Sequence, residues 1–340
     1  MFDELLQESV DYLEEDFYNK PFRFSYSSLS KLLYSPAAFY QLYVLGHKED
    51  KELPHLVEGS LIHYLLLENH NFDDKYVVSP DKLPTGPSKI LVDKVFSKNY
   101  HTIQANPNLD FEDFDEDILN VLKEINYYQN IKLDSDRLKK VITTETSSYW
   151  NFLKQKGTKT LIDKETLKYC EDAVEVIKSH PQIMHLLGQD AEPGQNIEVF
   201  NEEYLEGSLK GRTFGLKGII DNLKIDHDKK IIYINDFKTS GKTLSEFKST
   251  VDFYSYWLQA VIYMIIVSQK YFHLLEQDYQ LQFHFIVIDR YFNVYAFPVS
   301  EKTRNEWLDK FNETLKIADY HYTNNRYALP YEFDTNSVVL

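Results

Sequence analysis

The sequence predicts an α/β fold with a central mixed β-sheet flanked by helices, preceded by a largely helical amino-terminal half. Two observations support this prediction. Apolar residues recur at helical spacing through much of residues 1–188, whereas from residue 196 the pattern changes to alternating, β-branched runs. A long apolar helical segment follows these runs, so helices and strands alternate along the second half of the chain.

Helices are expected first. Serine residues suited to a helix N-cap open the segment 25–46, and Pro36 begins a second helix within it. A Leu-rich helix follows at residues 54–68. Residues 86–187 are expected to be mostly helical and to end at Gly188.

Strands follow in the second half. Three are expected in sequence, at residues 196–204, 207–225 and 229–239, with the turn residues Asp226 to Asp228 between the last two. A long helix at about residues 245–269, a strand pair at 281–300 and a last helix at 300–320 complete the chain.

The organisation is expected to be that of a single domain over residues 1–340, because the sequence contains no internal repeat and no low-complexity linker. Within it we expect a mostly helical part at 1–188, a sheet core at 189–300, and a carboxyl-terminal helix and tail at 301–340.

Composition limits the function. Of the 340 residues, 43% are hydrophobic and 26% charged, enough for one large core or two modest ones. The 37 Lys and Arg against 53 Asp and Glu give a net charge of −16, so a nucleic-acid partner would need a local basic surface. The single cysteine, Cys170, excludes an internal disulfide and a cysteine-rich metal site, and favours a reducing cytoplasm. No apolar stretch approaches a membrane span, and we expect no membrane partner.

The run IIYINDFKTS, residues 231–240, carries charged groups at the end of an otherwise apolar strand. Alternation sends Asp236 and Lys238 to one face of this strand and Phe237 to the other face, into the core. Asp221 ends an apolar run on the preceding strand. The short connection makes the two strands antiparallel neighbours, so the carboxylates of Asp221 and Asp236 could approach each other.

Two ionised carboxylates about 4 Å apart repel by roughly 4 kcal/mol at an effective dielectric near 20. A bound cation removes this repulsion, and oxygen ligands favour Mg²⁺, or Mn²⁺, over zinc. A lysine beside such an ion can activate water or stabilise charge on a phosphate. This combination of residues therefore suits phosphodiester hydrolysis, although a D-x-K sequence taken alone more often marks a surface ion pair.

Four motifs in order resemble the PD-(D/E)XK nuclease superfamily, and within it the RecB-like nucleases, including phage exonucleases similar to exonuclease VIII (RecE). The motifs are GSLIH (Gly59–His63), GIID ending at Asp221, DFK (Asp236–Lys238) and QAVIY (Gln259–Tyr263). The amino-terminal segment SYSSLSKLLYSPAAFY is also similar to the serine-rich opening of that group, so the likeness covers most of the chain. The resemblance implies a restriction-endonuclease-like core.

The resemblance also implies roles for five residues. His63, Asp221 and Asp236 would be ligands of a divalent metal, Mg²⁺ or alternatively Mn²⁺, and the carbonyl of Phe237 would complete the set. Lys238 would be the catalytic lysine, acting together with Asp221 and Asp236.

Further residues are candidates for contacting DNA or supporting the site. By the resemblance, Gln259 and Tyr263, which are four apart and share one helical face, would have this role. Glu198 lies where relatives often carry a further acid. Three basic residues precede Asp221 and could meet phosphates: Lys210, Arg212 and Lys217. A solvated strand face is the alternative explanation for these three.

The function that the resemblance implies is that of a stand-alone nuclease of the phage recombination type. Relatives with an iron–sulfur cluster need several cysteines and relatives fused to helicases carry Walker motifs, and this sequence has one cysteine and no Walker motif. Such a nuclease would degrade linear double-stranded DNA from its ends, 5′ to 3′, as a ring-shaped homo-oligomer in the host cytoplasm. It would pass a single strand to an annealing protein. Two alternatives stay open: an endonuclease or single-strand nuclease using the same site, and an inactive DNA-binding module, which the retention of Lys238 disfavours.

Overall fold

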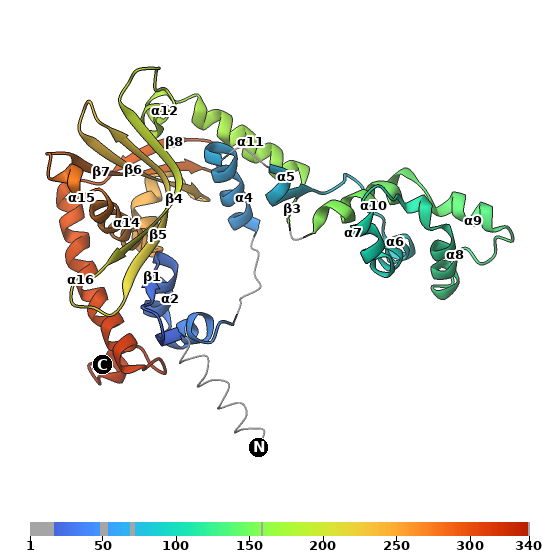
Figure 1. Cartoon of the computed structure of the whole chain (residues 1–340), viewed down its shortest axis with the longest axis horizontal. Helices are drawn as coiled ribbons and strands as arrows, with labels where there is room; N and C mark the ends of the chain where they lie inside the picture. Colours follow the sequence, from blue (N-terminus) through green and yellow to red (C-terminus); the bar gives the residue numbers. More distant parts are fainter. Residues whose placement is uncertain (1–16, 48–53, 69–71, 158, 339–340) are drawn as a thin grey trace. The chain divides into compact units, whose positions relative to one another are not determined.

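The computed structural model describes residues 17–47, 54–68, 72–157 and 159–338. The chain divides into two compact units, one formed by the described parts of residues 1–68 and 173–340 and the other by those of residues 69–172 (Figure 1). Helix α11 (Lys164–Lys178) runs through the point of division. The expectation of a single domain over residues 1–340 stays a prediction.

The first unit is built on a mixed sheet that, in the described part of the chain, has six strands. The strands are β1 (Arg23–Phe24), β4 (Ile197–Ser208), β5 (Gly215–Asp226), β6 (Ile231–Ser240), β7 (Gln280–Asp289) and β8 (Val294–Pro298). Strands β1, β5, β6, β7 and β8 are neighbours in that order, and β4 also pairs with β5. The β4–β5, β5–β6 and β7–β8 pairs are antiparallel, whereas β1–β5 and β6–β7 are parallel. The predicted mixed sheet flanked by helices is confirmed.

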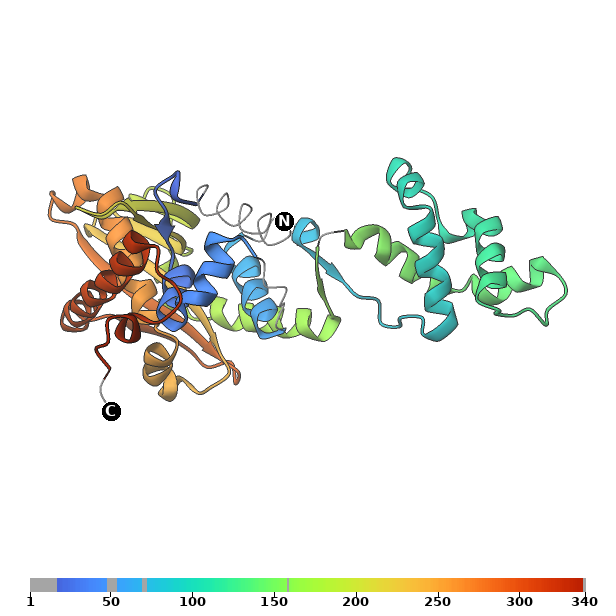
Figure 2. The ribbon, with the colours of Figure 1, turned by 90° about the horizontal axis from the view of Figure 1, so that it is seen from below.

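Helices from both ends of the chain cover this sheet. They are α2 (Tyr26–Tyr34), α3 (Pro36–Phe39), η1 (Tyr40–Val44), α4 (Pro54–His63), η2 (Tyr64–Glu68), α12 (Pro181–Leu187), η4 (Leu244–Glu246), α13 (Phe247–Phe253), α14 (Tyr256–Lys270), α15 (Phe272–Leu275), α16 (Glu301–Asn324) and α17 (Tyr331–Asp334). Figure 2 shows α2 and its neighbours, in blue, beside the yellow-to-red second half of the chain. Most of α14 is buried in the core of the unit.

Local sequence explains where the first helices begin. The Ser25 side chain accepts a hydrogen bond from the N–H of Ser28, and the Ser28 hydroxyl accepts one from the N–H of Ser25, which closes a capping box at the start of α2. Ser35 caps α3, whose first residue is Pro36. The two predicted helix starts are therefore confirmed.

One predicted helix is wrong. The expected single helix over about residues 245–269 is two helices, α13 and α14, bent by 77°. The bend falls at Ser255, which has a left-handed backbone with φ of 56° and interrupts the helical hydrogen bonding. Among the described residues no single helix is long and apolar enough to cross a membrane, and α13 with α14 meets that test only when both arms are counted together.

The second unit is mostly helical, as predicted for this part of the chain. Its elements are α5 (Phe72–Lys75), β2 (Tyr76–Val78), α6 (Gly86–Lys98), α7 (Tyr100–Ala105), η3 (Phe111–Phe114), α8 (Asp115–Glu124), α9 (Asp134–Val141), α10 (Thr144–Lys156) and β3 (Thr160–Ile162), which pairs with β2. Trp150 is fully buried at its centre against Phe96, Phe111 and Phe114. Its indole N–H donates to the carbonyl of Leu109 at 3.1 Å, which satisfies the buried polar atom.

Candidate active site

The predicted acids and lysine meet where β5 and β6 separate. The pairing of these antiparallel strands stops one residue short of Asp221 and Asp236. In place of a further ladder bond, the backbone N–H of Phe237 donates to Oδ2 of Asp221 at 2.7 Å. The Nζ of Lys238 lies 2.5 Å from Oδ2 of Asp236. The structure therefore brings Asp221, Asp236 and Lys238 together.

His63 reaches this place from the end of α4. Its Nδ1 lies 3.7 Å from Oδ2 of Asp221, and its Nε2 lies 3.2 Å from the carbonyl oxygen of Phe237. Gly59 stands one turn earlier on α4, and a Cβ there would lie only 3.2 Å from Oγ1 of Thr239 on β6. A glycine at this position lets α4 approach β6 closely enough for His63 to enter the site.

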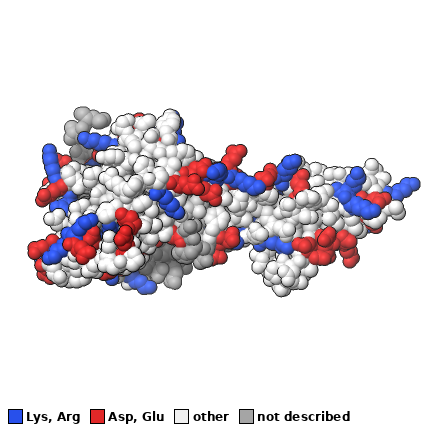
Figure 3. All heavy atoms as spheres, turned by 90° about the horizontal axis from the view of Figure 1, so that it is seen from above, with Lys and Arg blue, Asp and Glu red and all other residues white. Residues whose placement is uncertain are grey.

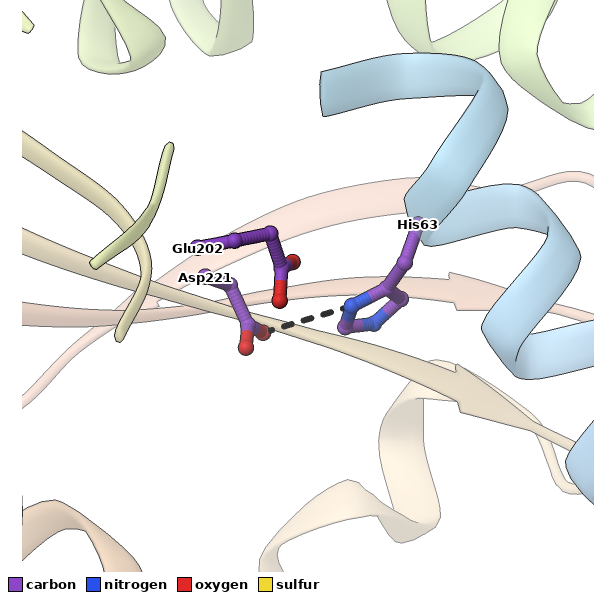
Figure 4. A group of neighbouring side chains, drawn as sticks. All are labelled: His63, Glu202 and Asp221. Carbon is purple, nitrogen blue, oxygen red and sulfur yellow. Dashed lines mark ion pairs between the residues drawn. The ribbon is translucent and has the colours of Figure 1, made fainter. Parts of the chain in front are cut away.

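Glu202 joins the group, although the sequence patterns did not single it out. A nitrogen of His63 and carboxylate oxygens of Glu202 and Asp221 all lie within 4.8 Å of one another (Figure 4). Glu202 follows Asn201, which pairs with Asn222, so Glu202 lies in register with Asp221 across β4 and β5. Its φ of 51° is left-handed, a conformation that costs about 1 kcal/mol or more for a residue other than glycine.

The side-chain alternation of the sheet reverses around Glu202. Leu205 and Phe200 are an odd number of residues apart on β4, yet both pack into the core that contains α14. Strict alternation would place them on opposite faces. On β5, Ile220 and Leu223 show the same reversal on either side of Asp221. Glu202 and Asp221 therefore lie where the alternation of core-facing residues is interrupted. A strictly alternating pattern would not predict which face these two carboxylates occupy.

Burial controls the protonation of the site. Burial raises the pKa of Asp221 to about 6, opposed by the charge of Lys238 and by the hydrogen bond from Phe237. Burial likewise raises the pKa of Asp236 to about 6. The pKa of His63 is lowered to about 4, first by burial and then by Lys238. Burial lowers the pKa of Lys238, but Asp236 and Asp221 outweigh it, so the net shift is upward and Lys238 stays protonated.

These donors fit a divalent cation. Carboxylate oxygens and one neutral imidazole nitrogen converge, and oxygen donors suit Mg²⁺ or Mn²⁺. Among the described residues, Oδ1 of Asp236 is buried without a hydrogen-bond partner, and a buried acceptor of this kind calls for a cation or a water. The carbonyl of Phe237, predicted as a ligand, faces His63 and lies 3.3 Å from Nζ of Lys238.

Gln259 and Tyr263 lie behind the site on α14. The side-chain amide of Gln259 donates to the hydroxyl of Tyr263 at 2.8 Å, and both residues are buried. The pKa of Tyr263 is raised, first by burial and then by the charges of Asp236 and Asp221. A Cβ at Gly218 of β5 would lie 2.7 Å from the ring of Tyr263, so that glycine lets the helix pack against the strand. The pair lies in the core beneath the acids, and its role in supporting the site or contacting DNA stays a prediction.

The three basic candidates lie along the β4–β5 hairpin. Nε of Arg212 pairs with Oδ2 of Asp319 at 2.8 Å, Lys210 is exposed, and Lys217 lies opposite Glu206. Lys217 is four residues from Asp221, roughly 13 Å along the strand. On the face drawn in Figure 3, Lys and Arg are interspersed with Asp and Glu. A role for these three residues in binding phosphates stays a prediction.

Glu198 lies elsewhere. It pairs with Ile225, four residues beyond Asp221, and its carboxylate is 2.8 Å from Nε2 of His227. It does not belong to the group formed by His63, Glu202 and Asp221. The further acid is thus on the expected strand, β4, but four residues later.

An asparagine adjoins each of the three acids. Asn201, Asn222 and Asn235 occupy neighbouring strands in register. The amide of Asn235 donates to Oδ1 of Asn222 at 2.8 Å, and the amide of Asn222 donates to Oδ1 of Asn201 at 2.8 Å. We call these three residues the amide ladder. An Asn next to an acid on three successive strands is a sequence signal that would have identified Glu202.

The amide ladder joins the sheet to two helices. Asn201 donates to the carbonyl of Leu67, in η2 directly after the helix that carries His63, at 3.0 Å. The other two amides donate to the carbonyls of Leu187 and Leu186 at the end of α12, at 3.3 and 2.9 Å. Carbonyls at a helix end lack partners within the helix. The ladder satisfies them and fixes the strands relative to both helices.

A mixed sheet with acids on neighbouring strands and an Asp-x-Lys motif within β6 is typical of a nuclease core. The family model of the PD-(D/E)XK nuclease superfamily matches residues 23–328, and the chain belongs to this superfamily. No curated protein matches the sequence. Among solved structures, the chain is similar to an inferred exonuclease from Eubacterium rectale, with 13% identity and a TM-score of 0.42 over 86% of this chain and 80% of that chain.

Proposed function

We propose that the protein is a Mg²⁺-dependent deoxyribonuclease of the RecB-like group that hydrolyses phosphodiester bonds. One observation carries this proposal: His63, Glu202 and Asp221 converge within 4.8 Å, next to the buried ion pair of Asp236 and Lys238. Carboxylates with raised pKa values and a charged lysine in one place are typical of functional sites.

The residues divide the chemistry among them. His63, Glu202 and Asp221, with Asp236 beside them, would hold the cation, which when bound supplies Lewis acidity and makes water more acidic. Lys238 is held by Asp236 with its charge intact, so it can donate a hydrogen bond to a phosphate oxygen or to the attacking water. Hydrolysis forms one bond from the water oxygen to phosphorus and breaks one phosphorus–oxygen ester bond. The leaving oxygen takes up a proton.

We further propose that the substrate is linear double-stranded DNA, cut from its ends with 5′-to-3′ polarity in phage-type recombination. Membership of the superfamily and the order of the four motifs support this substrate. The same reasoning leads us to propose a ring-shaped homo-oligomer in the host cytoplasm and a single-strand annealing protein as partner. The overall negative charge would suit a ring whose basic side chains face its channel.

The test compares linear and covalently closed duplex DNA of one sequence, each with Mg²⁺, with Mn²⁺ and with a chelator. We expect loss of the linear form only, and only with metal. Nicking of the closed circles would identify an endonuclease instead. Absence of cleavage with any divalent metal would refute the proposed hydrolysis and favour a DNA-binding module. End labels on either strand give the polarity.

A further inference from the structure

Three aromatic rings form a continuous path from Lys238 to the surface. The Nζ of Lys238 lies 4.9 Å from the ring centroid of Tyr256, which stacks on Tyr254 at 5.5 Å with an angle of 24° between the rings. Tyr254 in turn contacts Phe253 edge-on at 4.9 Å. We call Phe253, Tyr254 and Tyr256 the aromatic path. It begins at the candidate catalytic lysine and ends in solvent.

The outer two rings are exposed although the backbone beneath them is fixed. Phe253 is 77% exposed and Tyr254 51% exposed. They stand at the 77° bend between α13 and α14, next to left-handed Ser255. The hydroxyl of Tyr26, on α2, donates to the carbonyl of Tyr254 at 2.5 Å and holds the bend. A strained backbone that leaves the ring of Phe253 and one face of Tyr254 in water indicates a binding surface, because burial in the core does not account for their exposed area.

Two cations accompany the rings. Nζ of Lys242, in the segment after β6, lies 6.0 Å from the ring centroid of Phe253. That segment is joined to the end of β7, because the N–H of Arg290 donates to the carbonyl of Ser240 at 3.0 Å. Arg290 lies over the exposed ring of Tyr291 at 4.7 Å. Within the described residues, neither Lys242 nor Arg290 lies within ion-pair distance of an acid. Arg290 donates to the hydroxyl of Tyr291, and its remaining N–H groups, like the ammonium of Lys242, can reach a phosphate.

We propose that the aromatic path, with Lys242 and Arg290, binds an unpaired stretch of the DNA strand that is being cut. Bases would stack on Phe253 and Tyr254, and the two cations would meet the phosphates between them. The occupant is single-stranded, because stacking on a protein ring needs an exposed base face, which a paired and stacked duplex covers. The inference rests on the proposed function, since it places the strand on the way to Lys238.

The test measures binding without cleavage. A short oligonucleotide containing 2-aminopurine, whose fluorescence falls when it stacks, is titrated with the full chain in the presence of a chelator. We expect quenching by the unmodified protein. Phe253→Ala is expected to weaken binding about tenfold and remove most of the quenching, because stacking contributes that order of affinity for each base. Phe253→Tyr, which keeps the ring, should bind as the unmodified protein does.

Phe272→Ala provides the matched control, because Phe272 is 59% exposed on α15 and lies outside the site. Its affinity should not change. If Phe253→Ala binds and quenches like Phe272→Ala, the aromatic path does not bind single-stranded DNA and the inference is wrong. Failure of the proposed function has a separate signature, which is unmodified protein that cleaves no DNA with Mg²⁺ whatever its affinity for the oligonucleotide.

Discussion

Two lines of side chains cross the same three strands, and they differ sharply. The acid line consists of Glu202, Asp221 and Asp236, and the amide ladder stands one residue away on each strand. In the acid line, burial raises the pKa of two carboxyls, one buried oxygen lacks a partner, and one backbone is left-handed. In the ladder, each amide donates to a neighbour or to a helix end, and among the described residues the one ladder oxygen buried without a partner is Oδ1 of Asn235.

The difference shows how a fold can keep a destabilising site in place. Buried charges and a strained backbone cost free energy, so they persist only where the surroundings determine their position. Buried amides that donate to one another and to helix-end carbonyls supply that rigidity. Adjacent residues on one strand can therefore have different roles. The asparagine stabilises the fold, and the neighbouring acid is held in position for a ligand.

The largest effect is expected from removing Lys238, the lysine paired with Asp236 of the acid line. We expect Lys238→Ala to lower cleavage of linear DNA about a thousandfold, because the charge that would face the phosphate is lost. Asp236→Ala should abolish cleavage as well. Circular dichroism should show both variants folded. Lys316→Ala, which removes an exposed lysine paired with Glu313 on α16, is the control. Full activity of either site variant would show that the assignment of the site is wrong.

Breaking the amide ladder should instead reduce stability. Asn222→Ala removes the middle of the ladder and leaves the carbonyl of Leu187 and the side chains of Asn201 and Asn235 without one partner each. We expect the free energy of unfolding in urea to fall by about 3 kcal/mol, since unsatisfied buried polar groups cost about 1–3 kcal/mol each. Asn312→Ala, at an exposed position of α16, should have little effect. A loss below about 1 kcal/mol would contradict a stabilising role for the ladder.

Neutralising Asp221 of the acid line should instead raise the free energy of unfolding. Asp221 has a pKa of about 6 in the fold and about 3.9 in the unfolded chain, so the folded state binds more protons between these values. Its contribution to stability therefore falls as the pH rises through 6. In chelator at about pH 8, Asp221→Asn should raise the free energy of unfolding by about 2 kcal/mol, and the gain should vanish near pH 4. His63, whose pKa is lowered to about 4, is uncharged at pH 8 and does not titrate there.

Urea unfolding across this pH range checks the sign. The same variant should lose cleavage, so that a more stable protein is a less active one. A destabilised Asp221→Asn at pH 8 would mean that the hydrogen bond from Phe237 needs the charged carboxylate more than burial opposes it.

The sequence predicts what depends on local pattern. Helix starts follow from Ser25 and Pro36, and the Asp-x-Lys motif and short turn bring Asp221 beside Asp236. Two features of the structure could not be predicted from local sequence pattern, and both have the same cause. Ser255 and Glu202 adopt left-handed backbones that no residue other than glycine favours, so tertiary contacts impose them. The first bends a predicted helix, and the second places Glu202, which no sequence pattern singled out, beside His63 and Asp221.

The smallest expected effect distinguishes these two glutamates. Glu202→Gln keeps the size of the side chain but removes a charged oxygen from the group with His63 and Asp221, so we expect the affinity for Mn²⁺ to fall about tenfold. Glu198→Gln, on the same strand, should bind Mn²⁺ like the unmodified protein, because its carboxylate faces His227. Calorimetric titration without DNA measures both. If the two variants exchange these results, Glu198, at the position where relatives often carry a further acid, is the metal ligand, and the assignment of Glu202 to the site is wrong.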